Sequence, residues 1–139
     1  MRTVALALGA ALLGGCAATT GGGGAGSCDL SDGALDTAAF VIATAPVAGA
    51  RVESGFGVEG CSRTFESTVV WRLHARNGGL LGQGTATGGG VDGPGPFAFS
   101  VPFTVAERQL GHLEVFEEDA SDGEGFPPGR TVLPLVLVP

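Results

Sequence analysis

The sequence contains no lysine and no tyrosine, and it is poor in charged residues of either sign. Its seven basic residues are all arginines, they face 14 acidic residues, and the net charge at pH 7 is -7. Nucleic acids need a basic surface to neutralise their phosphates, and anionic lipid headgroups attract basic segments. The charge therefore argues against nucleic acid as a partner and against electrostatic docking on a membrane.

The sequence also lacks any helical periodicity longer than two turns. From Phe40 onward, short strand-like runs alternate with glycine or proline. Although 26 residues are glycine, 44% of the chain is hydrophobic, which is enough to build a core. Seven short runs with regular turns predict an all-β fold, an immunoglobulin-like antiparallel β-sandwich of about seven strands. The expected strands are Phe40–Ala45, Gly55–Cys61, Phe65–Ala75, Leu80–Thr87, Phe97–Phe103, Gly111–Glu118 and Val132–Val138.

The stretch TFESTVVWRLHARNGG, residues 64–79, contains the only tryptophan and one of two histidines. Successive side chains of a strand leave opposite faces of the sheet, so Trp71 is predicted to enter the core and His74 to face outward. By the same parity Phe65 should point inward. Asn77-Gly78-Gly79 then predicts a hairpin turn. Prolines at positions 102 and 134 indicate strand edges or breaks.

No apolar run is long enough to span a bilayer as a stable helix. The first sixteen residues instead have Arg2, an apolar run from Val4 to Leu13, and then Leu-Gly-Gly-Cys. This order closely resembles a bacterial lipoprotein signal, in which the cysteine, here Cys16, receives a diacylglycerol and becomes the first residue. The alternative is an ordinary secretory peptide with a chance cysteine.

The resemblance implies three segments. Residues 1–15 are expected to be the signal peptide, residues 16–37 a lipidated N-terminus with a flexible glycine-rich tether, and residues 38–139 the sandwich domain. Buried acyl chains contribute about 0.8 kcal/mol per methylene, and two or more chains hold a protein stably on a membrane. The expected location is the bacterial cell envelope, with the membrane contacted through lipid on Cys16.

With Cys16 acylated, two cysteines remain. Beyond the cytoplasmic membrane thiols are usually oxidised, so a Cys28–Cys61 disulfide is predicted, closing a loop of about 33 residues. Two free thiols or a metal or redox site are the alternatives, but neither cysteine lies in a CxxC pair and no histidine stands at ligand spacing.

The order of motifs resembles the immunoglobulin-like domain of bacterial spore-germination proteins, over roughly Phe40 to Val138. The residues that carry the resemblance are Pro46, Val58 and Gly60, Phe65 and Glu66, Gly95 to Phe97, and Leu113 to Gly123. The resemblance implies an interaction or structural module of envelope lipoproteins, with a germination-related role as one option. It supplies no catalytic residues, so no enzyme activity and no cofactor are expected.

Few side chains offer chemistry. Glu66 could be a general acid, but a salt bridge or a contact with backbone N–H groups at a strand end is preferred. His74 and His112, with Glu114 nearby, could form a zinc or copper site, although two histidines fall short of the usual ligand count. Asp119, Asp122 and Glu124 could bind calcium, but the segment lacks EF-hand spacing and is better explained as a solvated turn. No metal is therefore assigned.

Val70 and Phe116 fall on the outward parity of strands predicted to pair. An exposed apolar patch on a sandwich face often marks a partner site, although the tether or a loop could also cover it. The face of Val70 and Phe116, with Arg72 and Glu114 at its rim, is therefore predicted to bind a protein or wall component. The competing prediction is an envelope lipoprotein that binds a small ligand or metal.

Acylation of Cys16 can be tested on the native protein. Mass spectrometry of the mature N-terminus should find an acylated Cys16, and Cys16→Ala should abolish both the acylation and recovery in the membrane fraction. An unmodified N-terminus on the membrane-bound wild-type protein would contradict the prediction.

Overall fold

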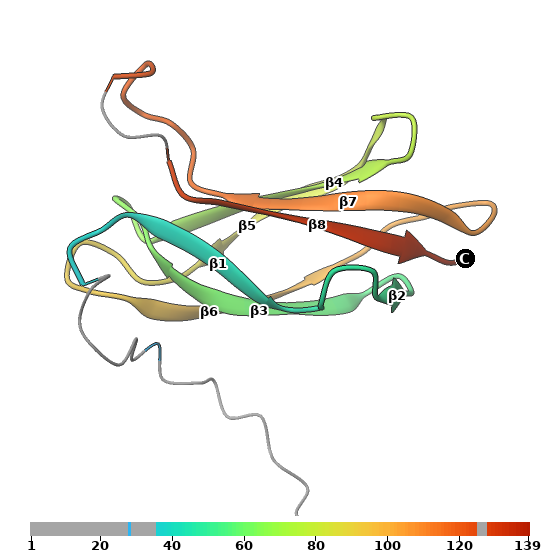
Figure 1. Cartoon of the computed structure of the whole chain (residues 1–139), viewed down its shortest axis with the longest axis horizontal. Coiled ribbons are helices and arrows are strands. Elements are labelled where there is room, and N and C mark those ends of the chain that lie inside the picture. The colour runs from blue at the N-terminus through green and yellow to red at the C-terminus, as the bar shows by residue number, and fades with distance from the viewer. Residues whose placement is uncertain (1–27, 29–35, 125–127) are drawn as a thin grey trace, which may run out of the picture.

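The chain folds into two facing β-sheets, which form the two layers of Figure 1. The computed structural model describes Cys28, residues 36–124 and residues 128–139. Within these residues there are eight strands and no helix. The strands are β1 (Phe40–Ala45), β2 (Arg51–Val52), β3 (Phe56–Arg63), β4 (Thr68–Ala75), β5 (Leu80–Thr87), β6 (Gly95–Val101), β7 (Gln109–Phe116) and β8 (Arg130–Leu137). The expected all-β, immunoglobulin-like sandwich is confirmed.

One sheet has three strands in the order β1-β3-β6, and the other has five in the order β2-β8-β7-β4-β5. All pairings are antiparallel except that between β2 and β8. Strand β2 was not predicted, because two residues are too few to show a periodicity. In the five-stranded sheet β4 lies between β5 and β7, so its inner face meets the centre of the core.

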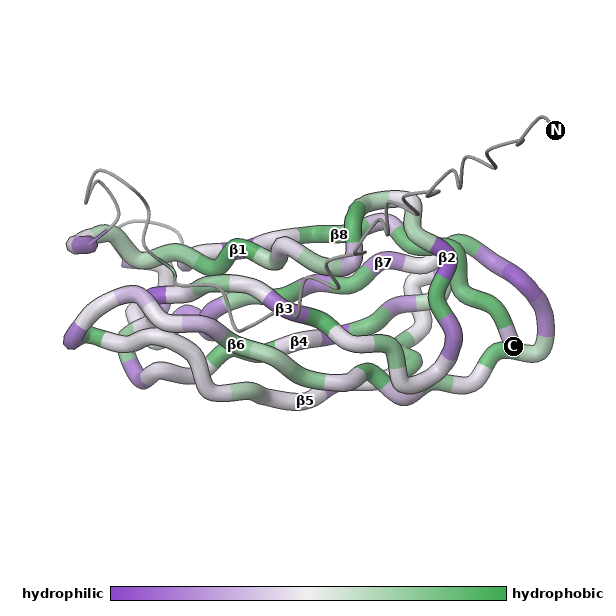
Figure 2. Tube along the Cα trace, turned by 90° about the horizontal axis from the view of Figure 1, so that it is seen from below, coloured by the Kyte–Doolittle hydropathy of each residue, from purple (hydrophilic) through white to green (hydrophobic). Residues whose placement is uncertain are grey.

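The inner faces of the two sheets carry the hydrophobic residues that the alternation predicts. Trp71 is buried, and its ring stacks on that of Phe99 from the opposite sheet, with 5.6 Å between centroids. Figure 2 shows the matching change of hydropathy along the strands, with strongly hydrophilic residues in loops at the ends of the sandwich. The fully buried hydrophobic side chains are Val58, Val69, Leu73, Val101, Leu113, Val115, Leu135 and Leu137.

Two glycines of β5 make room for the tryptophan. Gly84 lies directly opposite Trp71 in the β4–β5 pairing. A Cβ atom on Gly84 would lie 2.9 Å from three atoms of the indole ring, and one on Gly82 would lie 3.4 Å from it. The flat ring therefore rests against backbone that has no side chain, which is a packing reason for glycine in the middle of a strand.

The strand expected over Phe65–Ala75 corresponds to β4, and its expected start was wrong. β4 begins at Thr68, and Phe65 is 73% exposed instead of pointing into the core. Ser67 has a φ of 56°, a left-handed conformation that interrupts strand geometry before Thr68. The N–H group of Phe65 donates a hydrogen bond to Glu117 Oε1 at 2.6 Å, so the turn is held by a residue 52 positions away.

Pro102 lies at an edge, as expected, whereas Pro134 lies in β8, which has a neighbour on each side. β6 is an edge strand that ends at Val101, before Pro102. Pro134 lies within β8, whose outer neighbour β2 pairs only with Val136 and Leu137. Position 134 therefore does not need to donate a hydrogen bond to a further strand.

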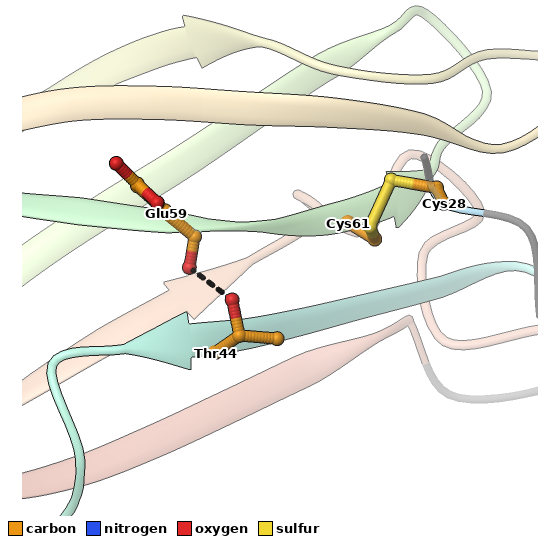
Figure 3. Close-up of a disulfide and its surroundings, with 4 residues drawn as sticks. All are labelled: Cys28, Thr44, Glu59 and Cys61. Atoms are coloured by element: carbon orange, nitrogen blue, oxygen red, sulfur yellow. Dashed lines mark hydrogen bonds between the residues drawn. A yellow bond between two sulfur atoms is a disulfide. The ribbon is translucent and has the colours of Figure 1, made fainter. Parts of the chain in front are cut away.

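The predicted disulfide is present. Cys28 and Cys61 are joined with a Cα–Cα distance of 5.7 Å across 33 positions of sequence. Figure 3 shows Cys61 on β3, near the place where the Thr44 hydroxyl of β1 donates a hydrogen bond to the Glu59 carbonyl at 3.2 Å. Cys61 alternates with the buried residues Gly60 and Ser62, so it belongs to the outer face of the three-stranded sheet. The disulfide attaches the N-terminal part of the chain to that face.

The signal peptide, Cys16 and the tether, apart from Cys28 and residues 36–37, lie outside the described residues, and their assignment stays a prediction. The described part of the chain contains no helix that is long and apolar enough to cross a membrane.

Removing the disulfide should destabilise the domain. A crosslink that closes a loop of 33 residues restricts the unfolded chain, and its loss should lower the free energy of unfolding by about 3–4 kcal/mol. Urea denaturation of Cys61→Ser would measure this. Cys28→Ser and the double variant should show the same loss, because each removes the same link. An unchanged urea midpoint in Cys61→Ser would contradict the prediction.

Adding a methyl group at Gly84 should also be destabilising. Gly84→Ala places a Cβ atom 2.9 Å from the Trp71 ring, and overpacking of this kind costs about 1–3 kcal/mol. Gly57→Ala is the matched control in β3, since its Cβ atom would meet nothing within 4 Å. Thermal unfolding should show a lower midpoint for Gly84→Ala and an equal or higher one for Gly57→Ala.

Candidate functional site

The candidate site lies on the outer face of the five-stranded sheet, opposite the core. The pairing of β4 with β7 sets Val70 opposite Phe116, Arg72 opposite Glu114 and His74 opposite His112. Since Trp71, Leu73, Leu113 and Val115 are buried, alternation puts these three pairs on the outer side. The structure therefore brings together all four residues predicted to bind a partner, together with both histidines.

The sequence predicted that Phe116 would be an exposed apolar contact, and this prediction was wrong. It is only 4% exposed, because two arginines cover its ring. The guanidinium carbon of Arg72 lies 4.9 Å from the ring centroid and that of Arg130 lies 5.3 Å from it. Arg72 also reaches the exposed Glu118 carboxylate at 3.8 Å. Val70 beside Phe116 is half-buried, so this end of the face is covered by cations.

The exposed apolar side chains of this face come from β7 and β8, and from Leu80 of β5, which lies opposite His74. Leu110 is 56% exposed and Val132 is 49% exposed. The pairing of β7 with β8 sets Leu110 opposite Val136 and Val132 opposite Glu114, with the exposed Pro134 between them opposite His112. The last run of the sequence, VLPLVLVP, is apolar at both parities, so the parity of Val132, Pro134 and Val136 could have identified these residues.

His74, His112 and Glu114 form a compact cluster beside this apolar strip. His74 Nε2 lies 3.9 Å from Glu114 Oε2, and His112 Nε2 lies 4.0 Å from Glu114 Oε1. The two imidazole rings are stacked, with 4.9 Å between centroids and 13° between planes. Within the described residues this is the one group of three His, Cys, Asp or Glu side chains close enough to hold a metal ion.

The hairpin turn between β4 and β5 orients His74. Its Nδ1 atom donates a hydrogen bond to the Gly78 carbonyl at 3.2 Å. Gly78 has a φ of 84°, and its N–H group donates to the Ala75 carbonyl at 2.9 Å. The predicted turn Asn77-Gly78-Gly79 therefore fixes the acceptor as well as reversing the chain.

The acidic segment after β7 forms a turn closed by its own side chains. The Ser121 N–H group donates to Asp119 Oδ1 at 2.9 Å, and the Ser121 hydroxyl lies 2.6 Å from the same oxygen. These two hydrogen bonds lower the pKa of the exposed Asp119 carboxyl below its usual value. Because the pKa is lowered in the folded protein, the ionised Asp119 stabilises this turn at pH values above the usual Asp pKa. This stabilisation is lost as the pH falls through the lowered pKa.

A broad open cleft at the same end of the sandwich has an acidic rim. Its lining includes Phe65, Val70, Glu66, Glu117 and Asp119. Glu66 is exposed, and it is Glu117 that binds the N–H group of Phe65, a role the sequence had offered for Glu66. Sequence reasoning missed Glu117 because nothing local to either residue indicates their contact.

Comparison with family models identifies the domain. A family model described as the immunoglobulin-like domain of bacterial spore germination matches residues 40–124. A search of curated proteins gives no match. Among solved structures, the crystal structure of CopC from Methylosinus trichosporium OB3b is similar at 17% identity and a TM-score of 0.43, covering 73% of this chain and 94% of that chain. The family match confirms the resemblance found in the sequence.

Proposed function

The chain belongs to the family of immunoglobulin-like domains of bacterial spore germination, and from this premise we propose that it is a non-enzymatic, lipid-anchored protein of the cell envelope that binds another protein. The family gives the immunoglobulin-like module. The lipoprotein-like N-terminus supports the anchoring, and the outer face of the five-stranded sheet supports the binding.

One observation carries the binding proposal. Leu110 and Val132 are about half exposed, and the side chains of Pro134 and Val136 connect them into an apolar strip along β7 and β8. Glu114 and Arg130 border this strip, since Glu114 lies opposite Val132 and Arg130 precedes Val132 by two residues on β8. An apolar centre with a charged rim is the usual composition of a protein interface.

The position of the disulfide supports the same face. Cys28–Cys61 attaches the N-terminal part of the chain to the outer face of the three-stranded sheet, on the other side of the sandwich. The link between Cys28 and Cys61 is therefore on the side away from the apolar strip. The strip then remains accessible to a partner in the envelope. An apolar patch bordered by charges favours a protein partner over a wall glycan.

In-cell crosslinking followed by purification of the protein tests the binding. The wild-type chain should recover a specific protein, and the double variant Leu110→Asp/Val132→Asp should recover at least about tenfold less, since burying two such side chains contributes more than 1.4 kcal/mol. Phe116→Asp is a poorer test, because Phe116 is buried and its replacement would destabilise the fold.

Val91→Asp is the matched control, since Val91 is 58% exposed but lies between β5 and β6, outside the apolar strip. It should recover the partner as the wild type does. Cys16→Ala should lose the partner through mislocalisation. Equal recovery by the strip variant and the wild type would rule out this face as the interface. Wall glycan crosslinked in place of a protein would refute the protein partner.

A further inference from the structure

We propose that His74, His112 and Glu114 bind a divalent transition-metal ion of the zinc or copper type on the outer face of the five-stranded sheet. One nitrogen from each imidazole and one carboxylate oxygen lie within 4.8 Å of one another. The side chains are 21%, 40% and 22% exposed respectively, so an ion can reach them from solvent while the sheet supports them from below.

The backbone positions all three ligands. His112 and Glu114 are two residues apart on β7, and His74 lies directly opposite His112 on β4. Both strands are central in their sheet, since β7 is also paired with β8 and β4 with β5. The ligands therefore come from paired strands, whose relative position is fixed by ladder hydrogen bonds, and a rigid support of this kind is what a metal site needs.

The contact of His74 with the Gly78 carbonyl favours the tautomer that a metal ligand requires. A carbonyl oxygen can only accept a hydrogen bond, so the contact with the Gly78 carbonyl at 3.2 Å places a proton on Nδ1. In the neutral ring the lone pair then belongs to Nε2, the atom that faces Glu114 at 3.9 Å. Metal-binding histidines commonly donate their other ring N–H to a backbone carbonyl in this way.

Glu114 is turned towards the histidines and not towards the nearest arginine. Arg72 lies directly opposite Glu114, but its guanidinium stacks on Phe116 and pairs with Glu118 at 3.8 Å. Each Glu114 oxygen faces one imidazole at 3.9 or 4.0 Å. Both distances are longer than a hydrogen bond, so a cation between the three groups would bring more stabilisation than the direct contacts do.

The spacing fits an ion after small side-chain movements. Ligand atoms at about 2.0–2.1 Å from a tetrahedral zinc ion are about 3.3 Å apart. The two carboxylate–imidazole separations of 3.9 and 4.0 Å would each have to shorten by about 0.6 Å. The two imidazole nitrogens lie within 4.8 Å of each other, so they would have to approach by up to about 1.5 Å. The imidazole planes, now 13° apart, would have to turn so that both lone pairs meet. His112 is the ring with room to turn, since it is the more exposed and His74 is held by Gly78.

The ligand types select the class of metal. Imidazole nitrogen suits zinc, copper and nickel, whereas calcium and magnesium prefer sites made of oxygen atoms only. Two histidines and one glutamate supply three ligands, which leaves a fourth position of a tetrahedral ion open to solvent. Copper(II) should bind more tightly than zinc, following the general order of affinities.

Isothermal titration of the full chain, extracted in detergent and free of any histidine tag, tests the site with Zn²⁺, Cu²⁺, Mg²⁺ and Ca²⁺. Zn²⁺ and Cu²⁺ should each bind at one equivalent, and Mg²⁺ and Ca²⁺ should not bind. His112→Ala and Glu114→Gln should each weaken Zn²⁺ binding by more than about tenfold, since even outer-shell changes cost about 10–100-fold. The ring protons of both histidines should shift in NMR spectra on adding Zn²⁺.

Glu59→Gln is the matched control. It makes the same chemical change on the exposed outer side of β3, in the other sheet, and should leave Zn²⁺ binding unchanged. The rival interpretation is a solvated pair of stacked imidazoles, which predicts no one-equivalent binding. Three results would each overturn the proposal. The first is the absence of one-equivalent Zn²⁺ binding, the second is equal Zn²⁺ binding by Glu114→Gln and the wild type, and the third is equal binding of Ca²⁺ and Zn²⁺. The titration involves no protein partner, so its failure would leave the docking proposal unaffected.

Discussion

The pairing of β4 with β7 is the constraint on which both the core and the outer face depend. Opposite residues in this pair share a face, so burial of Trp71 and Leu73 against Val115 and Leu113 puts the intervening residues outside. A shift by one residue would expose this core and bury an arginine and two histidines. The cost of that exchange holds the register. The same register places His74 opposite His112, so the metal-ligand cluster is a consequence of how the core packs.

Alternation in sequence was sufficient to predict the inner and outer faces of β4 and β7, because period 2 is a local property that each strand shows by itself. It failed at Phe65, where the same parity continues but the strand does not. The left-handed Ser67 and the hydrogen bond from Phe65 to Glu117 determine that boundary. Glu117 is 52 positions away, so the contact exists only once the sheet has formed, and no local pattern can reveal it.

Parity also predicts where a side chain points but not what covers it. Phe116 points outward as predicted, yet Arg72 from β4 and Arg130 from β8 lie over its ring. Guanidinium groups prefer the faces of aromatic rings and can cover them while remaining hydrated. Arg130 comes from the last strand, so this cover depends on a pairing that the sequence did not specify. The exposed apolar side chains of this face are therefore on β7, β8 and β5, beside the site first predicted.

The disulfide links Cys28 to the three-stranded sheet and not to the five-stranded sheet. Cys61 fixes Cys28 on the outer face of the three-stranded sheet. A chain extends at most about 3.6 Å per residue, so the 12 positions from Cys16 to Cys28 would keep a lipid on Cys16 within about 43 Å of that face. If the disulfide is reduced, the first strand attachment becomes Phe40 of β1, another 12 positions along. The disulfide therefore halves the length of chain between Cys16 and its first attachment to the sandwich, and that attachment lies on the face opposite the apolar strip and the metal-ligand cluster.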